Sequence, residues 1–148
     1  MVLALVPALA SAAEVKTGSR YFLPAGQTVG ENLYVASGDI AVAGRVEGDL
    51  YVAGGTVLVS GEVSDDLVVT GGTVTITGQV GGDLRIIGGN AVVTGTVMGD
   101  TFVLGGSLSE NGQTAGDLDF IGGMLNVNDG AVVGGDLTYR SNREANIS

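Results

Sequence analysis

The chain has 148 residues and 45% hydrophobic content, which is enough for one domain with its own core. Six Lys and Arg residues stand against sixteen Asp and Glu, and the basic residues are scattered, which excludes a surface that follows nucleic-acid phosphates. The absence of cysteine and histidine removes disulfides, thiol nucleophiles, histidine metal sites and the usual general base at neutral pH. We therefore expect no catalytic residues, no cofactor and no metal site.

Residues 1–13 resemble the end of a secretory signal peptide. An apolar stretch from Val2 to Leu9 runs into Ala10-Ser11-Ala12-Ala13, the small-residue pattern that signal peptidase cleaves after. This predicts cleavage after Ala12 or Ala13 and export to the cell envelope. The alternative is a hydrophobic N-terminus that is not cleaved. No later apolar run approaches the roughly 20 residues that a transmembrane helix needs.

A regular repeat begins at residue 32, with a period of about 17 residues. An Asp or Asn recurs in one register, at Asn32, Asp49, Asp66, Asp83, Asp100 and Asp117, and Asp136 follows after a unit that is longer by two. We expect the two extra residues to bulge outward at the turn-forming cluster Asn128-Asp129-Gly130. The predicted organisation is a cap or partial turn over residues 14–31 and a repeat domain over residues 32–148.

Apolar residues within each repeat alternate, as the inward side chains of a strand do. Leu50 and Val52 represent a first pair of columns, and Val57 and Val59 a second pair. A third, shorter wall carries one inward residue per repeat, such as Val63. Side chains at equivalent positions of successive repeats are expected to stack inside the molecule.

Glycines separate these apolar segments in three columns. Gly54-Gly55, Gly61 and Gly48 are examples of the three, and because glycine is favoured where φ is positive, they predict three corners per repeat. A helix would not tolerate so many glycines, each of which costs about 1 kcal/mol. The expected fold is all-β, a three-sided parallel β-helix of about 17 residues per turn and six to seven turns.

Two segments resemble the bactofilin family, the polymer-forming cytoskeletal proteins of bacteria. They are Gly48-Asp49-Leu50-Tyr51-Val52-Ala53-Gly54-Gly55-Thr56-Val57 and the run from Gly82-Asp83-Leu84 to Gly88-Gly89. The resemblance covers about Val29 to Tyr139. It implies a right-handed β-helix that polymerises with itself through its two ends, without nucleotide and usually at a membrane. The signal-like N-terminus makes the chain more similar to exported or membrane-anchored members, whose expected partners include membrane or cell-wall-associated proteins.

The ends of such a rod are the candidate site, because an uncapped solenoid exposes unpaired strand edges and an open core. The apolar residues expected to form the joints are Phe22, Leu23 and Leu33 at one end and Phe120, Leu137 and Tyr139 at the other. The alternative is that the terminal repeats simply cap a single rod.

The Asp column is a second candidate, either as a line of cation ligands or as side chains that accept backbone N–H bonds at a glycine corner. Asn32 in the same column favours the backbone role. Asp65-Asp66 offers two carboxylates for acid/base chemistry. Adjacent strand residues point to opposite faces, however, and Asp65 stands in a glycine column where Asp tolerates a left-handed backbone.

A different class of function is an extracellular binding module, adhesin-like or ice-binding, that uses a flat wall. Thr73, Thr75 and Thr77 form one rung of such an array, but the neighbouring rungs are mixed. A solenoid polysaccharide lyase is disfavoured by short uniform turns and few basic residues.

Overall fold

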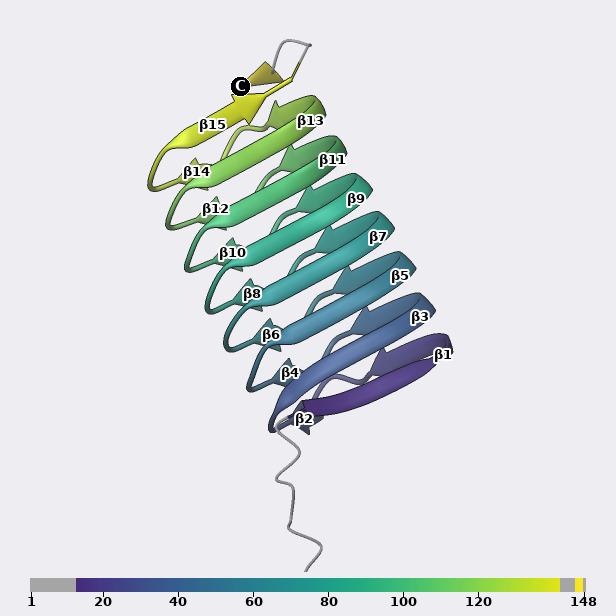
Figure 1. Ribbon diagram of the computed structural model, residues 1–148. Helices are drawn as coiled ribbons and strands as arrows, with labels where there is room; N and C mark the ends of the chain where they lie inside the picture. The colour runs from purple at the N-terminus through teal and green to yellow at the C-terminus, as the bar shows by residue number, and fades with distance from the viewer. Residues whose placement is uncertain (1–12, 142–145, 148) are drawn as a thin grey trace, which may run out of the picture.

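The computed structural model describes residues 13–141 and 146–147, and every regular element in these ranges is a β-strand (Figure 1). The strands wind into a rod of stacked coils, with the first described strand at one end of the rod and the last ones at the other. This confirms the predicted parallel β-solenoid. Within the described ranges there is no helix of the length and apolarity needed to span a membrane.

Strands of two lengths alternate along the chain. The long ones lie parallel in one sheet in the order β1 (Ala13–Leu23), β3 (Asn32–Val42), β5 (Leu50–Val59), β7 (Leu67–Ile76), β9 (Leu84–Val93), β11 (Thr101–Glu110), β13 (Leu118–Val127) and β15 (Leu137–Arg140), and β16 (Asn146–Ile147) also pairs with β13. The short ones form a second parallel sheet of β2 (Thr28–Val29), β4 (Arg45–Val46), β6 (Glu62–Val63), β8 (Gln79–Val80), β10 (Thr96–Val97), β12 (Gln113–Thr114) and β14 (Val132–Val133).

Each strand of the long sheet from β1 to β13 bends once and contributes two walls, whereas β15 contributes to one. In β5, Leu50 and Val52 are buried, and so are Val57 and Val59. The odd step from Val52 to Val57 would put them on opposite faces of a straight strand, so the strand has to turn at the glycine pair between them. We call the segment before the glycine pair the first wall, the segment after it the second wall, and the short strands the third wall.

The register confirms the repeat. Leu50 pairs with Leu67 and Leu67 with Leu84, each one repeat further along the chain, so like side chains stack in columns inside the coil. These leucines are fully buried. Each buried Leu or Val contributes roughly 1.5 to 3 kcal/mol, before the entropy of ordering the chain is subtracted.

The first and last coils are longer than the others. Leu23 pairs with Val42, whereas Thr28 pairs with Arg45, so the chain inserts two extra residues between Leu23 and Thr28. The same insertion occurs after Val127, which confirms the bulge predicted there. Both insertions are turns closed by a backbone hydrogen bond, from Gln27 N–H to the Pro24 carbonyl and from Ala131 N–H to the Asn128 carbonyl.

The segment expected as a cap or partial turn over residues 14–31 forms a coil of its own. Strand β1 pairs with β3 along its length, from Ala13 with Asn32 to Leu23 with Val42, and β2 pairs with β4. The signal-peptide segment predicted for residues 1–13 lies outside the described residues except for Ala13, which begins β1.

Close approach between coils, and not positive φ, accounts for the glycine columns. In the turns, positive φ occurs at Gly26 (85°) and Gly130 (88°), which lie in the two insertions and not in the columns. A Cβ placed on Gly78 would lie 1.8 Å from the carbonyl oxygen of Gly61 in the preceding coil, far inside contact distance. The corners were predicted correctly, but for the wrong physical reason.

Candidate functional surfaces

The Asp column forms a ladder of side-chain to backbone hydrogen bonds. The backbone N–H of Asp66 donates to Oδ1 of Asp49 at 2.9 Å, and that of Asp83 donates to Oδ1 of Asp66 at 2.8 Å. The pattern starts at Asn32, which accepts from Asp49 N–H at 2.8 Å. It continues through the later coils at Asp100, Asp117 and Asp136. These side chains therefore hold successive coils in register at one corner.

The ladder also explains the glycine that precedes most of these Asp residues. A Cβ on Gly82 would lie 2.2 Å from Oδ1 of Asp66, and one on Gly99 2.2 Å from Oδ1 of Asp83. The carboxylate of one coil therefore occupies the space that a side chain on the next coil would need. Across the described ranges, 13–141 and 146–147, no group of three or more acidic side chains is arranged to hold a metal ion.

Asp66→Asn and Asp66→Ala should separate hydrogen bonding from charge. Asparagine keeps an oxygen for the Asp83 N–H, as Asn32 does for Asp49, so we expect a change within about 0.5 kcal/mol in the free energy of unfolding. Alanine leaves the N–H without that acceptor, so we expect a loss of about 1 to 3 kcal/mol. Urea unfolding followed by circular dichroism measures both. Equal losses in the two variants would show that the charge matters more than the hydrogen bond.

The remaining sequence candidates are Asp65 and the threonine rung of the second wall. Asp65 is exposed, and its backbone is not left-handed, because no described non-glycine residue has a positive φ. The reason given for its place in the glycine column was therefore wrong. Thr73 and Thr56 lie side by side on the second wall, but the next coils place Asn90 and Ser107 beside them, so the threonine array does not extend along the rod.

The N-terminal end of the rod carries an ion pair. In β1, Glu14 lies over Leu33 and Lys16 over Val35, so both charged residues occupy positions that are apolar in the next coil. Their side chains form an ion pair at 2.5 Å, and the hydrogen bond that Lys16 donates to the Glu14 carboxylate raises the pKa of Lys16. On the second wall Tyr21 and Leu23 continue the apolar columns. This end is therefore partly polar.

The C-terminal end is apolar. Leu137 and Tyr139 of β15 lie over Leu118 and Phe120, and the ring of Tyr139 stacks on that of Phe120 with centroids 5.7 Å apart. Leu137 is 36% exposed, and Ile147, which lies over Val127, is 59% exposed. The last coil thus ends in apolar side chains that no further described coil covers.

The six predicted joint residues divide according to their burial. Phe22 is exposed, Leu137 is exposed and Tyr139 is half-buried, so these three can touch another molecule. Leu33 and Phe120 are fully buried, because β1 and β15 add a coil beyond them. Leu23 is also buried, although it lies in the first coil itself, at the end of β1. Any effect that Leu33 and Phe120 have on a joint is exerted through the terminal coil that covers them.

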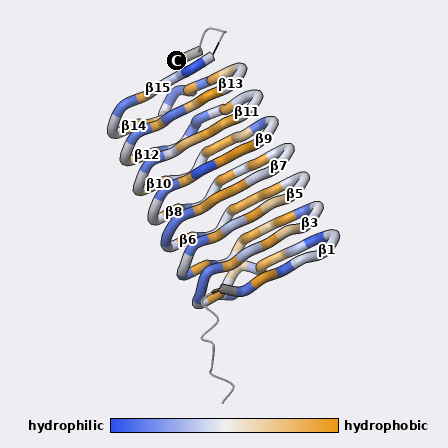
Figure 2. The backbone as a smooth tube through the Cα atoms, viewed as in Figure 1, coloured by the Kyte–Doolittle hydropathy of each residue, from blue (hydrophilic) through white to orange (hydrophobic). Residues whose placement is uncertain are grey.

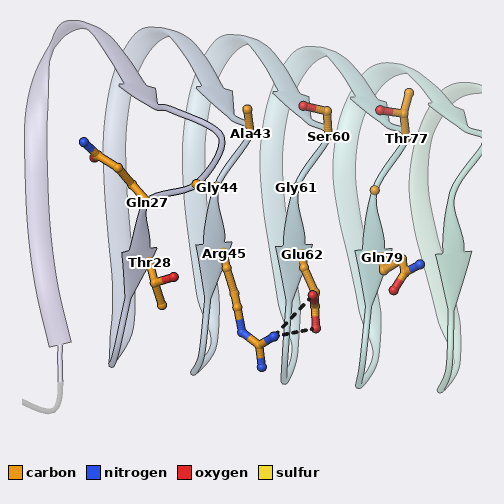
Figure 3. Close-up of a pocket in the computed structure, with 12 residues that line it drawn as sticks. Gln27, Thr28, Ala43, Gly44, Arg45, Ser60, Gly61, Glu62, Thr77 and Gln79 are labelled. Carbon is orange, nitrogen blue, oxygen red and sulfur yellow. Dashed lines mark hydrogen bonds and ion pairs between the residues drawn. The ribbon is translucent and has the colours of Figure 1, made fainter.

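An open groove follows the corner between the second and third walls (Figure 3). Its volume is about 470 Å³, and its floor is formed by the glycines Gly44, Gly61 and Gly78. Polar side chains stand on both sides, among them Arg45 and Glu62, which form an ion pair at 3.4 Å. The groove is lined by this charge pair, by hydroxyls and by amides.

The coil that contains β11 has a carboxyl group and two hydroxyls inside. Glu110 lies between Val93 and Val127 in an apolar column, and it is fully buried. Its Oε1 accepts the N–H of Gly112 at 2.9 Å, whereas its Oε2 has no hydrogen-bond partner. Burial raises the pKa of Glu110 to about 7, partly offset by the Gly112 hydrogen bond. In the same coil, the buried hydroxyls of Thr101 and Thr114 hydrogen-bond each other at 2.9 Å.

Neither Glu110 nor the Glu14–Lys16 pair was predicted from the sequence. The available signal for Glu110 was its position, because the repeat places it directly in the column of Val93 and Val127. No family model, no curated protein and no solved structure matches the chain. Its function is therefore inferred from its own surfaces.

Proposed function

We propose that the protein is a structural scaffold whose rods join end to end into filaments, without nucleotide, at the bacterial cell envelope. The observation that carries this proposal is the exposed apolar C-terminal coil, where Leu137, Tyr139 and Ile147 stand over the core columns. A second rod that covers this coil would continue both the apolar columns and the parallel sheets.

Strand edges support the same proposal. Strand β15 pairs with β13 on one side, and β1 pairs with β3 on one side, so within the described residues each presents an unpaired edge at its end of the rod. Such edges bind another strand through backbone hydrogen bonds unless they are protected. The resemblance to bactofilins, which polymerise through their ends, agrees with this use of the ends.

A charge placed on the last coil should prevent filament formation. Leu137→Asp puts a carboxylate at the centre of the proposed joint, where burying it without a partner would be strongly unfavourable, so we expect the filaments of the wild-type protein to be lost. Leu137 is on the exposed coil, so the variant should still fold, which circular dichroism checks. Negative-stain electron microscopy over a range of salt concentrations measures assembly.

The control is Thr73→Asp, which adds the same charge on the exposed face of the second wall and should leave the filaments intact. If folded Leu137→Asp protein still forms filaments, the C-terminal coil is not the joint.

A further inference from the structure

The side chains on the outer face of the first wall differ in size between the two halves of the rod. Two outward columns run along this face, one through Tyr51 and one through Ala53. In the N-terminal half the first column is large and the second small, with Tyr34, Tyr51 and Val68 beside Ala36, Ala53 and Thr70. In the C-terminal half the second column is large, with Ile87, Leu104 and Ile121, while the first column continues with Arg85, Phe102 and Asp119. This wall faces the viewer in Figures 1 and 2.

The small residues leave a hollow in the N-terminal half. Its volume is about 310 Å³, and it is lined by Ala36 and Ala53 with Tyr34, Tyr51 and Val68 beside them. The two tyrosine rings stack with centroids 4.7 Å apart and 5° between their planes, which makes a flat side to the hollow. In the C-terminal half, Ile87 is 49% exposed and Leu104 is 41% exposed. One half of the face is therefore hollowed and the other half carries protruding aliphatic side chains.

From this complementarity we infer that two copies of the chain pack through the outer faces of their first walls, with their rods antiparallel. The two-fold axis runs along the strand direction between β7 and β9. Each column then faces its own copy with the order of coils reversed, as an isologous interface requires. Leu104 of each copy enters the hollow over Ala53 of the other, and Ile121 lies over Ala36.

The same register brings matching groups together in the first column. Tyr51 opposes Phe102 of the second copy, and Tyr34 opposes Asp119, whose carboxylate can accept the phenol hydrogen bond. Val68 opposes Arg85, whose aliphatic stem can cover it while its guanidinium lies near Asp83 of its own chain at 3.5 Å. With the rods parallel, Asp119 would face Ile121 instead, so the antiparallel arrangement fits better.

The area permits this packing, and the charges lie mainly at the two rims of the face. The charged side chains in the two columns are Arg85, Asp119 and, at one rim, Arg140. The Asp column borders the opposite rim, where Asp49 accepts a hydrogen bond from the Tyr51 hydroxyl and Asp83 pairs with Arg85. In the antiparallel register this row of carboxylates faces its own copy at the edge of the interface, where water and salt screen the repulsion. Eight strands about 4.8 Å apart and five residues of width give roughly 34 by 16 Å, or about 1,100 Å² buried over both copies. Specific interfaces generally exceed about 1,000 Å².

This inference goes beyond the proposed end-to-end assembly, and its test uses a protein whose ends are blocked. Any dimer that remains must then form through another surface. In the Leu137→Asp variant, which blocks the ends, analytical ultracentrifugation should show a discrete dimer. Adding Leu104→Arg should raise the dimer dissociation constant about tenfold or more, since it buries a charge in an apolar hollow. Adding Thr73→Arg, a charge of the same sign on the second wall, should leave the dimer unchanged.

Cross-linking tests the register, since the chain has no cysteine of its own. A short bis-maleimide should link a mixture of Ala53→Cys and Leu104→Cys proteins, because Ala53 opposes Leu104 across the axis. Ala53→Cys protein alone should not be linked. Efficient linking of that single variant would contradict the antiparallel register.

Two outcomes would overturn the inference. One is a monomer in the end-blocked variant at micromolar concentration. The other is a monomer that floats with vesicles of phosphatidylglycerol and phosphatidylethanolamine and loses this binding on Leu104→Arg. In that case the occupant of the face is a lipid surface and not a second copy.

Discussion

Replacing Glu110 with valine is expected to raise the free energy of unfolding at pH 8 by about 3 kcal/mol. The pKa of Glu110 is raised by burial from 4.5 to about 7 in the folded protein. Below pH 4.5 the folded and unfolded states both hold the proton, so the contribution of Glu110 to stability is most favourable there. Between pH 4.5 and 7 the unfolded chain releases the proton while the folded protein keeps it, so stability falls as pH rises.

Valine removes this dependence because its side chain does not titrate, and it fits the site because the same column holds Val93 and Val127 on either side. Urea unfolding at intervals from pH 4 to pH 8 should therefore give curves for wild type and Glu110→Val that separate with rising pH. Glu47→Gln, at an exposed position, is the control and should follow the wild type. Parallel curves for wild type and Glu110→Val would show that Glu110 titrates normally in the folded protein.

Gly78→Ala should lower the free energy of unfolding by about 3 kcal/mol or prevent folding, although it adds a single methyl group. The added Cβ would lie 1.8 Å from the Gly61 carbonyl oxygen, and that oxygen accepts the backbone N–H of Gln79. Relief of the overlap would have to separate the two coils and break hydrogen bonds of both sheets. Circular dichroism and urea unfolding measure the change.

Gly30→Ala is the matched control for this substitution. A Cβ on Gly30 meets its nearest neighbour, a Glu47 carboxylate oxygen, at 3.6 Å, which is ordinary contact. We expect its stability to stay within about 1 kcal/mol of the wild type, because alanine also restricts the unfolded chain. A loss at Gly30 as large as that at Gly78 would attribute the effect to backbone flexibility instead of overlap between coils.

The coil itself could be predicted because its inward columns obey one rule. A residue such as Leu67 must match Leu50 below it and Leu84 above it, so the period and the alternation are both visible in the sequence. The backbone role of the Asp column was visible as well, because Asn32 replaces Asp without loss of the hydrogen bond.

The first coil was missed because its residues break that rule. Glu14 and Lys16 stand where Leu33 and Val35 stand one coil later, and an ion pair at the end of a rod leaves no apolar pattern to align. The physical reason for the glycine columns was also missed, because it depends on two residues and not on one. Positive φ is a property of one residue, whereas the contact between Gly78 and Gly61 depends on the distance between two coils, which sequence alone does not contain.

The outward columns were harder to predict than the core. Ala53 and Leu104 contact solvent in a single rod, so neither has to match its neighbours in the coil. Ala53 and Leu104 lie at equal distances from the middle of the rod, so that one can face the other in an antiparallel dimer. The middle of the rod could be located only once β1 was known to form a coil.

The insertions at Pro24–Gln27 and Asn128–Ala131 mark the first and last coils, and every coil between them advances the chain by the same number of positions. Each of these coils touches only its two neighbours, so the interior of the rod consists of interchangeable units. Deletion or duplication of one such unit joins equivalent points of adjacent coils and changes the length by about 4.8 Å without altering either end. The length of the rod can therefore change in fixed increments during evolution, while its terminal surfaces stay the same.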